Sequence, residues 1–130
     1  MKVLALDYGS ARTGVAVSDP TGTLARPVGV VQGASTESGL AELARLAREE
    51  DAERIVVGLP LTMRGTRGEQ VAETEGFVEA LRAAVDVPVE LFDERFTTDL
   101  AQQTPGAAPE DALAAAHLLS TYLEWCAARS

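Results

Sequence analysis

The stretch Leu4–Gly14, L-A-L-D-Y-G-S-A-R-T-G, joins an apolar run to a polar turn and leads directly into a second apolar run, Val15–Val17. The first run predicts a strand whose last residue, Asp7, carries a carboxylate where the chain turns back. Gly9 and Gly14 lack a Cβ, so they permit a tight turn and a close approach to the backbone. A carboxylate in this place can bind a metal ion or handle a phosphate, or it can simply belong to a polar hairpin turn.

The composition fits one compact domain. Of the 130 residues, 46% are hydrophobic, which is enough for one core and leaves little room for a second domain. Cys126 is the single cysteine, so no disulfide can form within the chain. The apolar run Val3–Leu6 is too short for a signal peptide, and no run is long enough to span a bilayer. We therefore expect a single domain over residues 1–130, located in the cytoplasm and not in a membrane.

The net charge of −9 counts against a protein that covers nucleic acid with positive charge. A nuclease, however, needs only a local group of cationic side chains beside carboxylates that bind metal. Five arginines lie in or beside predicted turns: Arg12, Arg26, Arg64, Arg67 and Arg95. They are candidates for contacts with a phosphate backbone, or else solvated side chains that increase solubility.

The first three β-prone runs predict an antiparallel meander. They cover Lys2–Asp7, Gly14–Ser18 and Val28–Gln32, with no room for a crossover helix between them. The period then changes at Ser35–Glu50, where apolar residues recur at the helical spacing. The next run, Arg54–Leu59, is apolar throughout, as expected of a strand covered on both faces and parallel to the first.

The rest of the chain alternates helix and strand. A loop with two arginines, Pro60–Gly68, follows the fourth strand, at the edge where ligands gather in α/β sheets. We expect a helix at Glu69–Val85, a strand at Val87–Phe92, a short helix at Phe96–Gln103 and a final helix from Pro109. This order predicts an α/β fold with a five-stranded mixed sheet, an antiparallel meander followed by parallel strands, and helices on both faces.

In this topology three distant positions can meet: the end of the first strand, the end of the fifth, and the first turn of the last helix. They hold Asp7, Glu94 or its neighbour Asp93, and Asp111 or its neighbour Glu110. Carboxylate oxygens are the ligands that Mg²⁺ and Mn²⁺ prefer, and such a group can hold two ions about 4 Å apart. Each carboxylate also has a structural explanation, because acids are favoured in the first turn of a helix and as helix caps.

Three stretches resemble the YqgF (RuvX) family of bacterial RNase H-like proteins. They are L-A-L-D-Y-G-S-A-R-T-G-V-A-V-S-D at residues 4–19, I-V-V-G-L-P-L-T-M-R-G-T at 55–66 and F-D-E-R-F-T-T at 92–98. The resemblance covers essentially the whole chain. It implies an RNase H-like fold and a Holliday-junction-resolvase-like nuclease that uses Mg²⁺ or Mn²⁺. The RNA partner that it implies is the ribosomal RNA precursor, with a role in maturing the 5′ end of pre-16S RNA.

The resemblance also assigns roles to residues. It implies that Asp7, Glu94 and Asp111 are the catalytic, metal-binding carboxylates. Glu94 is preferred over Asp93 because the resemblance specifies the middle residue of the D-E-R motif. The candidates for substrate binding are Arg12, Thr62, Arg64, Arg67 and Arg95. Many members carry a basic residue shortly before the last Asp, whereas this chain reads A-A-P-E-D at 107–111. The chain therefore lacks a group that could contact phosphate there.

Other functions fit parts of the same pattern. A Holliday-junction-resolving DNA endonuclease would use these carboxylates on branched DNA and requires a dimer, whereas an RNA nuclease can be a monomer or a homodimer. A non-catalytic RNA-binding factor in ribosome assembly or transcription would keep the fold with a weakened metal site, and the acidic composition favours it. One half of a sugar kinase or actin-like ATPase has a similar D-x-G turn, but such enzymes close two domains around a nucleotide.

Overall fold

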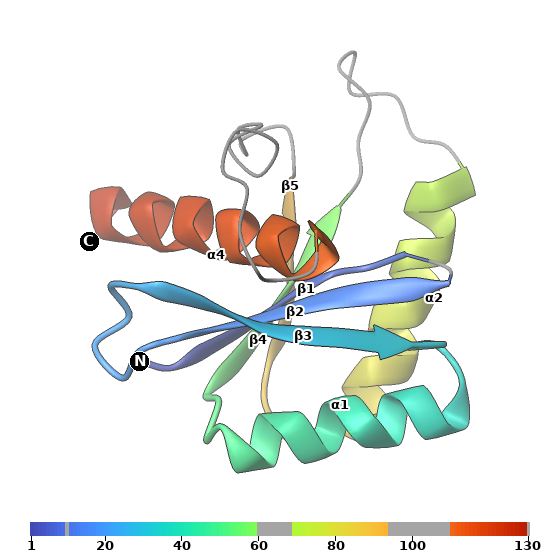
Figure 1. The fold of residues 1–130 in the computed structure, drawn as a ribbon. Helices are drawn as coiled ribbons and strands as arrows, with labels where there is room; N and C mark the ends of the chain where they lie inside the picture. The colour runs from blue at the N-terminus through green and yellow to red at the C-terminus, as the bar shows by residue number, and fades with distance from the viewer. Residues whose placement is uncertain (10, 60–68, 94–109, 130) are drawn as a thin grey trace.

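A computed structural model describes residues 1–9, 11–59, 69–93 and 110–129. Figure 1 shows its elements, which are β1 (Val3–Asp7), β2 (Arg12–Ser18), β3 (Ala25–Gln32), α1 (Glu37–Glu49), β4 (Arg54–Leu59), α2 (Glu69–Ala84), β5 (Val89–Asp93) and α4 (Glu110–Arg129). The loop predicted at 60–68 and the short helix predicted at 96–103 lie outside the described residues. No helix in the described part of the chain is both long enough and apolar enough to cross a membrane.

The five strands form one mixed sheet in the order β3-β2-β1-β4-β5. β2 pairs antiparallel with both β1 and β3, and β4 pairs parallel with both β1 and β5. The predicted meander followed by parallel strands is therefore confirmed. β1 is the central strand, where the antiparallel half of the sheet meets the parallel half.

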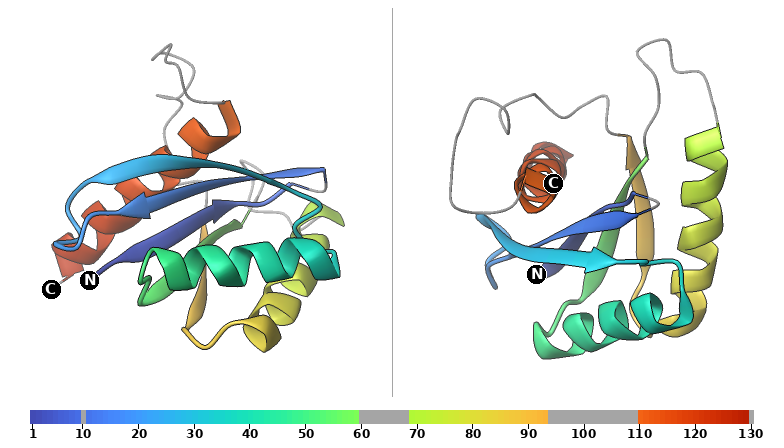
Figure 2. Two further views of the ribbon diagram at one scale, coloured as in Figure 1. Left: turned by 60° about the horizontal axis from the view of Figure 1, so that its bottom comes forward. Right: turned by 45° about the vertical axis from the view of Figure 1, so that its right-hand side comes forward.

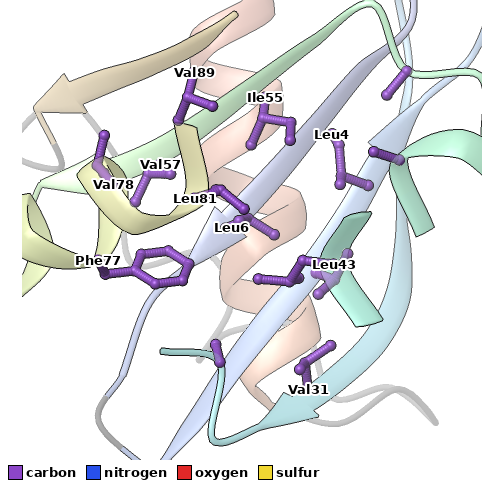
Figure 3. Close-up of a cluster of buried hydrophobic side chains, with 14 of the residues drawn as sticks. Leu4, Leu6, Val31, Leu43, Ile55, Val57, Phe77, Val78, Leu81 and Val89 are labelled. Atoms are coloured by element: carbon purple, nitrogen blue, oxygen red, sulfur yellow. The ribbon is translucent and has the colours of Figure 1, made fainter. Parts of the chain in front are cut away.

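Alternate residues of the central strands enter two separate cores. In β1, Leu4 and Leu6 belong to a cluster with α1 and α2, whereas Val3 and Ala5 belong to a cluster with α4. Figure 2 shows α1 and α2 on one side of the sheet and α4 on the other. Figure 3 shows the first cluster, in which Phe77 of α2 and other side chains of both helices meet the sheet. The predicted helices on both faces are confirmed, and the period of two in β1 sets which side chains face which layer.

Side-chain and backbone caps fix both ends of α1. Thr36 caps the first turn, since its Oγ1 accepts a 3.1 Å hydrogen bond from the Gly39 amide, so the helix begins at Glu37. At the other end the Ala52 amide donates to the Ala47 carbonyl over 2.9 Å, and Asp51 takes a positive φ of 54°. This is the backbone arrangement in which glycine is usually found after a helix.

Candidate active site

Asp7 is the last residue of β1 and faces α4. The alternation along β1 places Asp7 on the same face as Val3 and Ala5, and its side chain is half-buried. Across the antiparallel pair, Asp7 is opposite Gly14 of β2. On the parallel side Leu6 pairs with Val57, so the next residue of β4 beside Asp7 is Gly58. Neither neighbour of the carboxylate in the sheet therefore adds a side chain of its own.

The turn that follows Asp7 is held from two sides. The ring of Tyr8 stacks on Phe77 of α2, with the ring centroids 4.3 Å apart and the planes 16° apart. The Gly9 amide donates to Oγ1 of Thr13 over 3.5 Å, and Thr13 is fully buried. A Cβ at Gly9 would lie 2.5 Å from the carbonyl oxygen of Arg12, so the close approach in this turn requires glycine. These contacts fix where β1 ends and hence where the carboxylate lies.

Arg12 begins β2, directly across this turn from the end of β1, and its side chain is exposed. Arg26, the other arginine of the predicted group within the described residues, lies in β3 and forms an ion pair with Glu50 over 3.3 Å. Of the substrate-binding candidates, Arg12 is the one whose side chain the structure describes. The other four substrate-binding candidates, Thr62, Arg64, Arg67 and Arg95, lie outside them. Arg12 is therefore an accessible cation on the same hairpin as Asp7.

The strands β1, β4 and β5 are mutually parallel, so their last residues lie at one edge of the sheet. β5 ends at Asp93, and Leu59 of β4 pairs with Asp93 in register. Glu94 follows directly in the sequence but lies outside the described residues. The backbone of Asp93, the predicted alternative to Glu94, therefore lies at the same edge of the sheet as Asp7.

The helix α4 begins toward this same edge. Its C-terminal half lies at the opposite end of β1, where Met1 and Val3 share a hollow with Leu123, Cys126 and Ala127. Asp111 precedes Leu123 by twelve residues, which corresponds to about 18 Å of helix toward the edge where Asp7 lies. The structure gives the backbone of Asp111 in the first turn, as predicted, and does not describe the side chain of Asp111 or of Glu110.

A hydrogen-bonded group that the sequence analysis missed anchors α4. Nη1 of Arg54 donates to the Tyr122 hydroxyl over 2.8 Å, and this hydroxyl donates to the Glu90 carboxylate over 3.1 Å. Tyr122 is fully buried, and burial raises the pKa of its hydroxyl to about 12. The group ties α4 to the first residue of β4 and to β5. The spacing of apolar residues in the last helix does not reveal these contacts, because the partners of Tyr122 are 68 and 32 residues away in the sequence.

Asp7 is the one member of the predicted metal site whose side chain lies within the described residues. Within the described residues no three His, Cys, Asp or Glu side chains come close enough to hold a metal ion, and the predicted partners of Asp7 are not among the side chains described. Asp7 itself fits a hard divalent cation, because it offers carboxylate oxygens at a half-buried position between two glycines.

The acidic residues are concentrated in one layer of the fold. Residues 37–53 and 69–86, which include α1 and α2, contain eleven acidic and three basic residues, a net charge of −8. The rest of the chain is therefore close to neutral, with a net charge of −1. Since α1 and α2 cover the face of the sheet opposite α4, most of the negative charge lies away from the face that carries Asp7.

Comparisons with known proteins agree with this architecture. A family model described as RuvX, Holliday junction resolvase, matches residues 1–125. A protein of Chloroflexus aggregans named "Putative pre-16S rRNA nuclease" is 42% identical, over 94% of this chain and 92% of its own length. A relative of the same name from Chloroflexus aurantiacus is 40% identical, over 94% and 86%. The structure of T. thermophilus RuvC in complex with a Holliday junction substrate superimposes with a TM-score of 0.60, at 17% identity over 96% of both chains. The sheet and its flanking helices thus have the RNase H-like fold of this resolvase.

Proposed function

The chain belongs to the RuvX family, and on that premise we propose that it is a nuclease that hydrolyses phosphodiester bonds in the precursor of 16S ribosomal RNA. The relatives that carry this name match nearly the whole chain and are themselves matched over most of their length. The observation that carries the proposal is the position of Asp7: a half-buried carboxylate at the end of the central strand, facing α4 and flanked by Gly14 and Gly58. We place the reaction in the cytoplasm.

In this proposal Asp7, Glu94 and Asp111 hold Mg²⁺ or Mn²⁺. A divalent metal ion held by these carboxylates would supply an activated water and stabilise the charge on the leaving oxygen. Asp7 contributes from the end of β1, Glu94 from the residue after β5, and Asp111 from the first turn of α4. The chain itself forms no covalent bond to the substrate.

The RNA backbone would be held by cations around the same edge. Arg12 is exposed across the turn from Asp7, and Arg64, Arg67, Arg95 and Thr62 come from the segments that follow β4 and β5 in the sequence. Charged hydrogen bonds from arginine to phosphate oxygens position a strand without reading its sequence. The near-neutral charge of the chain outside the α1 and α2 layer supports approach of RNA to this side.

A DNA endonuclease that resolves Holliday junctions is the second candidate. It is favoured by the description of the family model and by the fold shared with a resolvase solved on a junction. Both candidates use the same carboxylates, so the choice between them depends on the substrate. A non-catalytic RNA-binding factor would instead bind the precursor without cutting it.

The test is a cleavage assay with purified protein and Mn²⁺ or Mg²⁺ on three end-labelled substrates: a pre-16S fragment with its 5′ extension, an unrelated single-stranded RNA and a four-way DNA junction. We expect metal-dependent cutting of the pre-16S fragment that Asp7→Asn abolishes and Asp86→Asn leaves unchanged. Asp86 is the matched control because it is exposed, follows α2 and lies on the far side of the sheet from Asp7. Cutting of the junction alone would favour the resolvase, and tight binding of the precursor without any cutting would favour the binding factor.

A further inference from the structure

A groove runs along the side of α1 that is turned toward α2. It consists of two adjoining hollows of about 450 and 380 Å³, and Ala44, Arg48 and Ala84 line both of them. Five of the lining residues of α1 and its C-terminal turn follow the helical spacing i, i+4, i+7, i+11, i+14 and so form one stripe: Glu37, Ala41, Ala44, Arg48 and Asp51. Leu40, Ala47 and Ala52 line the groove beside this stripe. Ala41 and Ala44 form the centre of this stripe. The acidic Glu37 precedes them and the basic Arg48 follows them.

The stripe is complementary to itself when a second α1 lies antiparallel to the first. If the two helices cross between residues 42 and 43, Glu37 of each copy lies opposite Arg48 of the other. Ala41 then lies opposite Ala44 in the middle, twice, because the arrangement is two-fold symmetric. Ala41 is exposed, whereas Ala44 forms the floor of the groove and is only 7% exposed. Small side chains at both positions let two helix axes approach closely, toward the short end of the range of about 8–10 Å for packed helices.

This pairing would use two charged side chains of α1, Glu37 and Arg48. Neither Glu37 nor Arg48 makes a hydrogen bond or an ion pair through its side chain within the part of the chain that the structure describes. By contrast Arg45, on the other flank of the same helix, pairs with both Glu42 and Glu49. The helix thus satisfies its charges on one flank and leaves one of each sign available on the flank that lines the groove.

We propose that the groove is an interface for a second copy of this chain, joined through an antiparallel α1–α1 contact. In an antiparallel pair the positive end of each helix dipole lies beside the negative end of the other, which is favourable. Asp51 then lies near the N-terminal end of the second copy's α1. That position gives its carboxylate a favourable partner, whereas at the C-terminal end of its own helix an acid is unfavourable. The contact lies on the face of the sheet opposite Asp7, so both Asp7 carboxylates stay accessible.

The interface is small, and the two layers that approach each other both carry a net charge of −8. We therefore expect a weak dimer, with a dissociation constant on the order of 10 μM. At about 0.15 M salt the Debye length is about 8 Å, so the general repulsion is screened while close Glu–Arg pairs persist. Molar mass should be measured under these conditions by sedimentation equilibrium, with protein from about 1 to 200 μM.

Charge reversals at Glu37 and Arg48 test the pairing, because two-fold symmetry makes each change occur at both ends of the contact. Glu37→Arg and Arg48→Glu should each weaken dimerisation at least about tenfold, because each places like charges opposite one another. The double variant Glu37→Arg/Arg48→Glu restores opposite charges at both ends and should return the dissociation constant to within about threefold of the wild type. Glu73→Arg is the control, since it makes the same charge change at an exposed position of α2 outside the groove and should have little effect. Circular dichroism verifies that each variant is folded.

A protein that stays monomeric at the highest concentration would overturn the proposal. So would a dimer that is insensitive to the single variants, or one that the double variant weakens further. The measured quantity is mass and not cleavage, so the outcome is independent of the proposed nuclease activity.

Discussion

Asp7 and Gly14 face each other directly across the β1–β2 pair, on the side of the sheet that α4 covers. Directly opposite residues in such a pair have Cβ atoms about 5 Å apart, so any side chain at position 14 would stand next to the carboxylate. Gly58 takes the corresponding place on the other side of β1. Within the described strands, the end of β1 therefore presents one acidic side chain, with a residue that lacks a side chain on each side of it in the sheet.

Gly14→Val should reduce cleavage at least about tenfold, because the added isopropyl group would occupy space that a metal ion or the RNA backbone needs next to Asp7. The measurement is the cleavage rate at saturating Mn²⁺, with stability followed by urea unfolding. Gly29→Val is the matched control: Gly29 also lies in the sheet, in β3, and a Cβ there would meet nothing within 4 Å. Equal rates for the two variants would show that Gly14 has no part in the site.

Gly9→Ala should destabilise the protein by about 1–3 kcal/mol, because its Cβ would lie 2.5 Å from the Arg12 carbonyl oxygen and the turn after Asp7 would have to shift. The free energy of unfolding in urea gives the result. Gly76→Ala provides the comparison, since a Cβ at this position of α2 meets nothing within 4 Å, and it should stabilise by about 0.5–1 kcal/mol. A Gly9→Ala protein as stable as the wild type would contradict the account of this turn.

Asp51→Gly should stabilise the protein by about 1 kcal/mol. Asp51 follows the C-terminal cap of α1 with a φ of 54°, where glycine has no steric cost, and the change also removes an acid from the negative end of the helix. Thermal unfolding at low protein concentration, where the chain is monomeric, measures this effect. A lower melting temperature would contradict this prediction. It would mean that contacts of the Asp51 carboxylate within its own chain stabilise the fold by more than the positive φ destabilises it.

Tyr122→Phe should cost about 1–2 kcal/mol, because it leaves Arg54 and Glu90 without the hydroxyl that joins them. The pH dependence provides a second test. Below pH 10 the Tyr122 hydroxyl is protonated in both the folded and the unfolded chain. Between about pH 10 and about pH 12 only the folded chain keeps the proton, so wild-type stability should fall as the pH rises through this window. The phenylalanine variant should fall less steeply, and equal slopes would contradict the assigned pKa.

The sequence predicted the fold well where local patterns decide it. The apolar runs located all five strands, and the helices predicted to start at Ser35 and at Pro109 begin at Glu37 and Glu110. Strand ends were less accurate: β3 begins at Ala25, three residues before the predicted start at Val28. The additional residues include Pro27, which β3 can accommodate because it is an edge strand, where a missing amide donor is tolerated.

The sequence predicts those features of the site that lie within a single strand or turn, but not those that depend on how strands pair. A carboxylate at a strand end is visible in the sequence, and Asp7 lies where the pattern of L-A-L-D indicated. That Gly14 and Gly58 flank it depends on the register of two strand pairs, one of them formed with a strand some 50 residues away. The contact of Arg54 with Tyr122 likewise depends on how α4 packs across the sheet, which the spacing of apolar residues in one helix does not specify.

The central claim is that Asp7, Glu94 and Asp111 bind the same divalent metal ions. The most direct measurement is a titration of Mn²⁺ into the purified protein, followed by the electron paramagnetic resonance signal of free Mn²⁺, for the wild type, Asp7→Asn, Glu94→Gln, Asp111→Asn and the Asp86→Asn control. We expect each of the three site variants to weaken Mn²⁺ binding at least about tenfold and Asp86→Asn to leave it unchanged. Wild-type affinity in Asp7→Asn would contradict the central claim.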